Sequence, residues 1–185
     1  MYKPDEITVI DNFLPEHKYK QVRGHFVNKN YFWQIGPSLY EREDVEILID
    51  PKLDCQGVSM LYYHKGKNDL SRLKPIVPIL SKLKVTEKHL IRIKANCNFC
   101  KESVVKSGWH IDVDPDIAGK GMTAIYYCNT CNGKTLFKTG EEIDSVENRL
   151  LIFPNYMAHT PQYQTDEPIR VVINLNWVLD INDKP

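Results

Sequence analysis

The chain lacks an excess of charge of either sign. Its 24 Lys and Arg residues balance 24 Asp and Glu residues, so the formal net charge is zero. Proteins that bind nucleic acids usually carry a basic stripe that neutralises phosphates. The composition therefore gives no indication of a nucleic-acid partner.

The sequence also lacks a long hydrophobic run. It contains no stretch of about 18 consecutive apolar residues, the length that a membrane-spanning helix needs. It shows no leading apolar segment of the kind found in secretory signals. We therefore expect no membrane insertion and a cytoplasmic location, in the host cytoplasm if a phage encodes the chain. In that compartment the five cysteines are expected to be reduced thiols, metal ligands or core residues.

The 185 residues are enough for one domain with its own core, which we place over residues 1–185. Residues 1–88 predict supporting elements. These are a β-favouring segment over 7–14, an amphipathic helix over 15–27, two or three strands within 31–66, and a helix over 69–83 that contains two prolines.

From residue 89 the pattern changes to short strands separated by turn signals. We expect strands over 89–98, 122–129, 149–153 and 170–179, with weaker ones near 134–137 and 159–163. Repeated short strands of this kind are typical of a sandwich or barrel. The expected fold class is α+β, mainly β, with a β-barrel core over 89–180 and supporting N-terminal helices.

His110-Ile111-Asp112, followed by His159 and then Arg170, is the motif that points most clearly to chemistry. On a strand, side chains two residues apart project from the same face, so His110 and Asp112 can converge on one ion. Two imidazoles and one carboxylate are the ligand set that leaves three positions open on a non-haem Fe(II). Each residue alone has an ordinary structural interpretation, as a strand-end histidine, a turn acid or a surface arginine. The ordered set favours a metal site.

The stretch from about residue 89 to 179 resembles the double-stranded β-helix (jelly-roll, cupin-like) of the Fe(II)/2-oxoglutarate-dependent dioxygenases. It is most similar to their prolyl 4-hydroxylase-like branch, and its short length also fits single-domain members of the kind that some phages encode. The matching residues are His110-x-Asp112, the run Thr123 to Asn129, the run Arg149 to Pro154, His159 and Arg170.

The resemblance implies that His110, Asp112 and His159 bind iron. It implies that Arg170 pairs with the distal carboxylate of 2-oxoglutarate, helped by the Tyr127 phenol, with Thr123 on the same strand face. Close relatives carry a tyrosine near positions 96–98, where this chain has Asn96, Cys97 and Asn98, so an Asn amide could replace that phenol as donor. The family uses O2, and ascorbate is a further candidate cofactor.

Two Cys-x-x-Cys pairs are a separate candidate metal site. Cys97 with Cys100 and Cys128 with Cys131 have the spacing of zinc knuckles. In the expected barrel, the strands ending near Cys97 and Cys128 flank the Arg170 strand in parallel, so the four sulfurs could meet at one sheet edge. Such a zinc would be structural and additional to the iron. The alternative is that Cys97 and Cys128 simply pack in strands.

The resulting hypothesis is a 2-oxoglutarate-dependent Fe(II) dioxygenase (hydroxylase). It would hydroxylate a C–H bond of a prolyl or other residue in a peptide or protein, or of a small molecule, and release succinate and CO2. A lid could come from region 34–66 or from segment 99–109. The alternative is a catalytically silent β-helix that binds a small carboxylate or a partner. A nucleic-acid dealkylase ranks last because residues after Arg170 are apolar, Asn or Trp. The sequence does not determine the oligomeric state.

Overall fold

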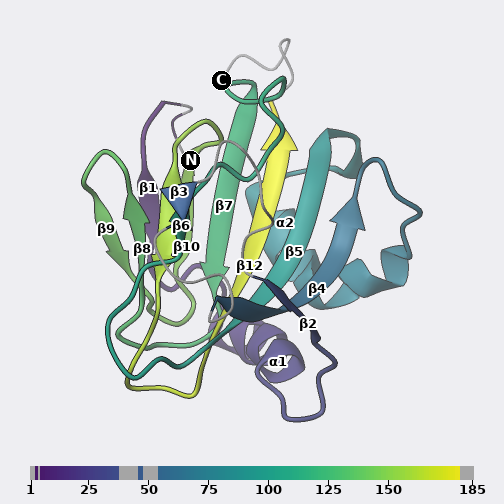
Figure 1. The fold of residues 1–185 in the computed structure, drawn as a ribbon. Helices are drawn as coiled ribbons and strands as arrows, with labels where there is room; N and C mark the ends of the chain where they lie inside the picture. The colour runs from purple at the N-terminus through teal and green to yellow at the C-terminus, as the bar shows by residue number, and fades with distance from the viewer. Residues whose placement is uncertain (1–2, 4, 38–45, 48–53, 180–185) are drawn as a thin grey trace.

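The computed structural model describes residues 3, 5–37, 46–47 and 54–179. Its largest element is a seven-stranded antiparallel sheet with the order β1-β10-β7-β12-β5-β4-β2 (Figure 1). In chain order these strands are β1 (Thr8–Ile10), β2 (Gln34–Pro37), β4 (Cys55–Tyr63), β5 (Leu90–Phe99), β7 (Gly121–Tyr127), β10 (Leu150–Pro154) and β12 (Ile169–Val178). β12 lies between β5 and β7, which therefore run parallel to each other.

Two smaller sheets lie beside the seven-stranded one. They consist of β11 (His159–Gln162), β8 (Lys134–Phe137) and β9 (Glu142–Asp144), and of β3 (Glu46–Ile47) with β6 (Gly108–Trp109). An isolated antiparallel bridge between His110 and His159 joins the end of β6 to the start of β11. This bridge brings two segments 49 residues apart in sequence into direct contact, and it determines the geometry of the candidate site.

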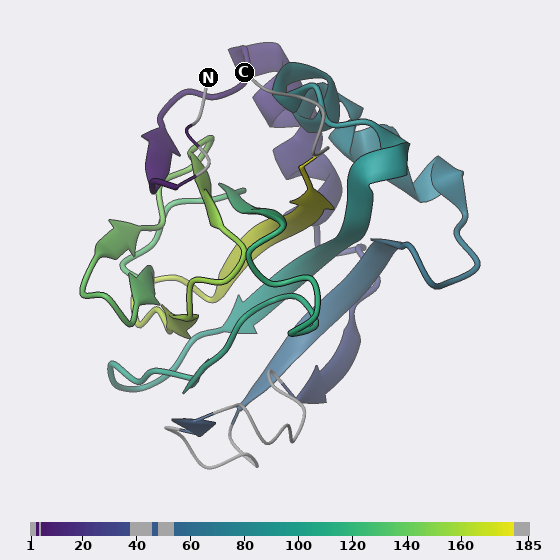
Figure 2. The same cartoon turned by 90° about the horizontal axis from the view of Figure 1, so that it is seen from above.

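The helices pack on one side of the large sheet (Figure 2). They are α1 (Glu16–Phe26), η1 (Leu70–Ile76), α2 (Val77–Leu83) and η2 (Glu87–His89). Apolar residues of the helices and of the sheet face beneath them form the larger core cluster, which includes Val22, Phe26, Ile76, Ile93 and Ile173. A second cluster, which includes Ile125, Tyr127, Phe137 and Phe153, lies on the other side of the sheet, toward β8. The described helices include none that is both long and apolar enough to span a bilayer.

Most of the expected elements are present. The helix expected over 15–27 is α1, the weak strands expected near 134–137 and 159–163 are β8 and β11, and the region 31–66 contains three strands. The expected helix over 69–83 is instead a 3₁₀ helix followed by a separate α-helix. Pro75 and Pro78 each lack the N–H that a continuous helix would use, which explains the break.

Three expectations need correction. The segment 7–14 forms a strand of only three residues, because the chain turns after Ile10 and Asn12 adopts a left-handed conformation with φ of 50°. β6 and β9 were not expected. The lid expected from region 34–66 cannot include Cys55–Tyr63, which is a full strand of the large sheet. Its segments 38–45 and 48–53, which were part of the lid prediction, lie outside the described residues.

Candidate metal centre and co-substrate pocket

His110, Asp112 and His159 gather at the bridge between β6 and β11. Their ligand atoms all lie within 4.8 Å of one another, and they form the one group of this kind among the described residues. Asp112 Oδ2 lies 3.6 Å from His159 Nε2, and Asp112 Oδ1 lies 3.9 Å from His110 Nε2. The structure thus brings together the three side chains that the sequence indicated as metal ligands.

Both imidazoles are oriented as metal ligands. Nδ1 of His110 lies 3.0 Å from the carbonyl oxygen of Gly108, and Nδ1 of His159 lies 3.1 Å from that of Met157. A carbonyl only accepts, so each Nδ1 carries the proton and each Nε2 presents a lone pair. Burial, followed by electrostatic coupling to the neighbouring His159 ring, lowers the pKa of His110 to about 4, so the His110 ring is neutral at pH 7.

Asp112 is an ionised carboxylate with one free oxygen. Its Oδ1 accepts a hydrogen bond of 2.8 Å from Arg92 Nη2, whereas its buried Oδ2 has no hydrogen-bond partner in the part of the chain that the structure describes. Burial opposes ionisation, but the Arg92 guanidinium and His159 hold the pKa of the carboxyl well below its usual value. A buried oxygen without a partner normally carries a large desolvation penalty. A divalent cation between the two Nε2 atoms and this oxygen would remove that penalty, so the three residues fit a metal.

A chain of hydrogen bonds fixes the orientation of Asp112. Arg92 Nε donates to Asn176 Oδ1 at 3.2 Å, and Asn176 Nδ2 donates to Thr123 Oγ1 at 2.9 Å. Thr123 and Asn176 are fully buried, so the chain is anchored in the large sheet. Groups that orient a metal ligand in this way usually matter for metal affinity.

A pocket opens beside the three ligands, on the sheet face that is opposite to the helices. Three adjacent strands form its mostly polar floor. The lining residues are Gln56, Val58 and Met60 on β4, Arg92, Lys94, Asn96 and Asn98 on β5, and Arg170, Val172 and Asn174 on β12. Thr135, Ile125, Ser107 and Pro161 also line it. The metal-binding triad and Arg170 therefore share one pocket.

Arg170 is 2% exposed, and no carboxylate among the described residues pairs with it. Its Nη2 donates to Thr135 Oγ1 at 3.0 Å and its Nε donates to Ser145 Oγ at 3.2 Å. A Cβ at Gly133 would lie 3.0 Å from Arg170 Cδ, so a glycine at this position leaves room for the side chain. A buried guanidinium held only by neutral groups is strongly stabilised when an anion binds it.

Tyr127 and Thr123 lie four residues apart on β7, so they share one strand face as expected. Neither is among the described residues that line the pocket. The Tyr127 hydroxyl donates to Thr135 Oγ1 at 2.8 Å, and the Arg170 guanidinium lies 5.5 Å from the Tyr127 ring centre. Thr135 lines the pocket, and because its Oγ1 already accepts hydrogen bonds from Tyr127 and Arg170, its own proton is available for a further acceptor. Thr135, rather than Tyr127, is therefore placed to donate directly to a bound carboxylate.

Asn96 and Asn98 line the pocket, where an amide could take the place of the relatives' tyrosine. They alternate with Ile93, Ala95 and Cys97, which face the helices. The sequence analysis missed Arg92, Lys94, Thr135 and Ser145. For the first two a signal existed: polar residues at 92, 94, 96 and 98 alternate with apolar residues on a single strand, so one face of that strand had to be polar.

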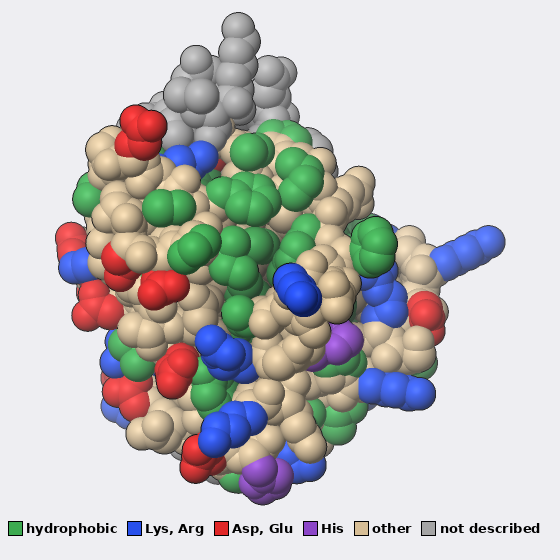
Figure 3. All heavy atoms as spheres, turned by 90° about the horizontal axis from the view of Figure 1, so that it is seen from below, with side chains coloured by type: hydrophobic (Ala, Val, Ile, Leu, Met, Phe, Trp, Pro, Cys, Tyr) green, Lys and Arg blue, Asp and Glu red, His purple; other side chains and the backbone are tan. Residues whose placement is uncertain are grey.

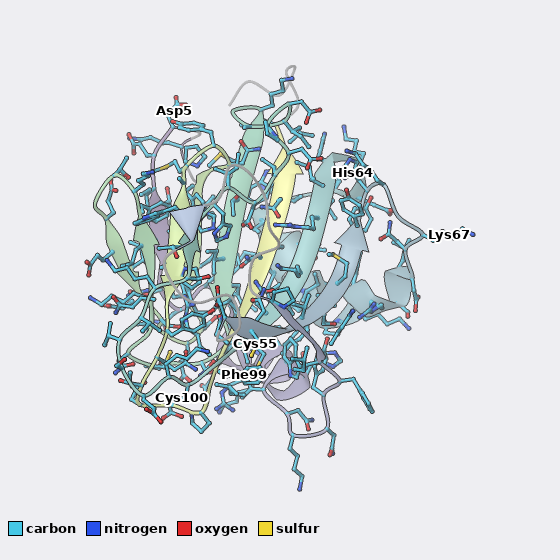
Figure 4. All side chains as sticks on the ribbon, in the orientation of Figure 1. Asp5, Cys55, His64, Lys67, Phe99 and Cys100 are labelled. Carbon is cyan, nitrogen blue, oxygen red and sulfur yellow. The ribbon has the colours of Figure 1, made fainter. Side chains whose placement is uncertain are left out.

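The structure gives the zinc prediction no support. The flanking arrangement of Cys97 and Cys128 about Val171 is as expected, but the four thiols do not form a metal-binding group among the described residues. Cys97 and Cys128 are buried in the core, whereas Cys100 is exposed at the outer end of the barrel (Figure 4). Burial raises the pKa of Cys97 to about 11 and raises that of Cys128 further, which disfavours thiolates. Cys97 and Cys128 therefore pack in the core, which is the alternative to zinc binding.

No protein-family model and no curated protein sequence matches the chain. Solved structures do. A prolyl hydroxylase from Trichoplax adhaerens, in complex with a hypoxia-inducible factor peptide fragment, is 16% identical, with a TM-score of 0.62 over 93% of this chain and 83% of that one. A 2OG-Fe(II) oxygenase family oxidoreductase from Burkholderia pseudomallei is 9% identical, with a TM-score of 0.61 over 93% and 84%.

A viral collagen prolyl hydroxylase from Paramecium bursaria Chlorella virus-1, in a 2OG complex, is 12% identical, with a TM-score of 0.55 over 94% of this chain and 96% of that one. The chain therefore has the double-stranded β-helix fold of the 2OG-Fe(II) oxygenases, as the sequence resemblance implied.

Proposed function

We propose that the chain is an Fe(II)- and 2-oxoglutarate-dependent dioxygenase that hydroxylates a C–H bond in a peptide, a protein or a small molecule. One observation carries the proposal: Arg170, which is buried and has no acidic partner among the described residues, shares a pocket with a His-Asp-His triad in which one carboxylate oxygen has no hydrogen-bond partner among those residues either. The fold, shared with prolyl hydroxylases, supports it. The participation of strands from both halves of the chain in one sheet supports a single domain over 1–185.

In this proposal His110, Asp112 and His159 hold iron, which when bound supplies the chemistry of oxygen activation. Arg170 and Thr135 bind the distal carboxylate of 2-oxoglutarate, and Tyr127 acts through Thr135 by holding its hydroxyl. Arg92 keeps Asp112 ionised and turned toward the metal. Thr123 acts one step further away, by holding Asn176. Asn96 and Asn98 present amides to the co-substrate.

The substrate class within this proposal extends from prolyl to other residues, because the fold alone does not select among them. The two neighbours described as prolyl hydroxylases make a peptide or protein the first substrate to test. On the face seen from below, acidic and basic side chains both occur (Figure 3), and the net charge is zero. We accordingly propose no nucleic-acid substrate. Ascorbate remains a prediction, and we do not propose a structural zinc.

The test compares the parent protein with Arg170→Ala and with Arg149→Ala. Arg149 is a matched control because it pairs with Asp11 at the surface, away from the pocket. We expect Arg170→Ala to weaken 2-oxoglutarate binding to the Mn(II)-loaded protein by roughly 10–100-fold, the value of a charge-assisted bidentate contact. Arg149→Ala should leave it unchanged. Iron-loaded parent protein should convert 2-oxoglutarate to succinate. If it binds metal but shows no turnover with any substrate tested, the silent binding module is the better description.

A further inference from the structure

The pocket carries more positive charge than the proposed iron and co-substrate require. Its described lining residues include three cations, Arg92, Lys94 and Arg170, and one carboxylate, Asp112. Three minus one leaves a charge of plus two. Iron(II) and the 2-oxoglutarate dianion cancel each other, so the same surplus remains when both are bound. A buried surplus of this size is costly unless another anion enters.

When each lining cation is matched with a negatively charged group, Lys94 is the cation that has none. Arg92 is bonded to Asp112, and Arg170 is assigned to the distal carboxylate of 2-oxoglutarate. Within the described part of the chain, no hydrogen bond or ion pair involves Lys94 Nζ. Burial, followed by the positive charge of Arg92, lowers the pKa of Lys94 to about 8, which agrees with an ammonium that lacks an anion.

Lys94 lies at the end of the pocket away from the Arg170 side chain. On β5 it is four residues from Asn98, the residue opposite Arg170, which is roughly 13 Å along the strand. Its charge acts on both Asp112 and His110, so it is close to the metal-binding triad. In register beside it are Met60 on β4 and Asn174 on β12. The reacting part of a substrate must reach the same region.

The amides next to Lys94 are also incompletely bonded. Across the described ranges, the buried Oδ1 atoms of Asn96 and Asn174 have no hydrogen-bond partner. 2-Oxoglutarate offers only acceptor atoms, so it cannot satisfy a carbonyl oxygen. A second ligand with an N–H or O–H group can. These oxygens and the Lys94 ammonium together match a molecule that carries a negative charge and a donor close together.

We propose that Lys94 anchors a carboxylate of the primary substrate close to the carbon that is hydroxylated, while the amide oxygen of Asn174 beside it accepts a hydrogen bond from a neighbouring N–H of that substrate. This inference rests on the proposed function and narrows its substrate class to an acidic side chain, either that of free aspartate or glutamate or that of an acidic residue within a peptide.

The experiment measures probe binding by calorimetry to protein loaded with Mn(II) and 2-oxoglutarate. The probes are aspartate with asparagine and glutamate with glutamine, each pair as free amino acids and as the central residue of end-blocked Gly-X-Gly. The members of a pair differ only in the carboxylate. We expect at least one acid to bind about tenfold or more tightly than its amide, the value of a charge-assisted hydrogen bond. The free and blocked arms distinguish an amino acid from a peptide as the source.

The variants are Lys94→Met, Lys94→Arg and, as a matched control, Lys67→Met. Lys67 lies on an exposed loop at the outer edge of the molecule (Figure 4). Lys94→Met should abolish the preference for the acid and leave the affinities for Mn(II) and 2-oxoglutarate within about twofold. Lys94→Arg should restore part of the preference, and Lys67→Met should behave like the parent.

Three results overturn the inference: equal affinity for acids and amides, no binding of any probe, or an equal loss of probe and 2-oxoglutarate affinity in Lys94→Met. The last result would make Lys94 a co-substrate ligand. Failure of the proposed function is distinguishable, because the parent would then fail to bind Mn(II) or 2-oxoglutarate before any probe is added.

Discussion

The two faces of strand β5 differ sharply in chemistry. On one face Ile91, Ile93, Ala95 and Cys97 are apolar and at most 7% exposed, and three of them belong to the core under the helices. On the other face Arg92, Lys94, Asn96 and Asn98 line the pocket. Successive residues of the same strand therefore serve stability and ligand binding in alternation.

The comparison shows how a protein can bury cations and amides without losing its fold. The apolar face stabilises the strand through packing, and the polar face is left with unsatisfied groups such as Asn96 Oδ1. Substitutions on the two faces should therefore have opposite signatures. Those on the helix side should lower stability without changing ligand affinity. Those on the pocket side should change ligand affinity without lowering stability.

The largest effect is expected for His159→Ala, at the metal itself. This change removes one of three ligands, so metal affinity should fall by more than the roughly 10–100-fold that loss of an outer partner causes. Titration with Mn(II) measures it, and His17→Ala, on the N-terminal helix, serves as a control. Retention of parental affinity in His159→Ala would show that the triad is not the metal site.

On the helix side, Ile93→Ala should destabilise the protein by about 2–5 kcal/mol, since it removes a fully buried side chain and leaves a cavity. Urea unfolding measures the change in the free energy of unfolding. The Mn(II) affinity of the folded fraction should stay within about twofold, because no lost contact involves the pocket. A large change in that affinity would contradict the separation of the two faces.

On the pocket side, Arg92→Met should lower metal affinity by about 10–100-fold, because Asp112 loses the hydrogen bond and the charge that keep it ionised and oriented. The same Mn(II) titration applies. Arg149→Met removes a surface ion pair and should change nothing. Equal behaviour of the two variants would mean that Arg92 does not position the ligand.

Lys94→Met should stabilise the protein at pH 7 by about 2 kcal/mol, because it removes an ammonium group that burial disfavours. This value is smaller than the full pKa shift would give, since the side chain is partly exposed. The pKa of Lys94 is about 8 in the folded protein and near 10.5 as its ordinary value. Below pH 8 Lys94 is protonated in both the folded and the unfolded protein, so the full cost of burying its ammonium lowers the stability of the parent. Between these values the unfolded chain binds more protons, so parental stability rises with pH and the advantage of the variant shrinks. Urea unfolding from pH 7 to 10.5 tests this; a constant difference would contradict it.

The smallest effect concerns the thiols. At pH 8 a thiol reagent should modify exposed Cys100 rapidly, while the buried Cys97 and Cys128, with raised pKa values, stay protected. Peptide mass mapping identifies the modified sites, and Cys100→Ser removes the fast phase. Protection of Cys100 together with release of zinc on denaturation would revive the four-thiolate site.

Particular residues show how far the sequence could be interpreted. The helix at 16–26 and the strands around Arg170 were predictable because apolar residues recur at the period of each element. His110, Asp112, His159 and Arg170 were identifiable because their types and order resemble one enzyme family. β6 could not be predicted, since two residues carry no periodicity and pairing alone makes them a strand. Thr135 was missed because its strand gives no sign of which side chain lies against Arg170.

By itself the sequence determined the alternation of the strands and the chemical types available for a metal and a dicarboxylate. These properties depend on local periodicity and on residue identity, which are present in the chain before it folds. The tertiary structure alone decided that Arg92 holds Asp112, that Thr135 stands between Tyr127 and the pocket, and that Lys94 faces the triad without an anion. The physical reason is that contacts across strands depend on register, and register is set by the pairing of segments far apart in the chain.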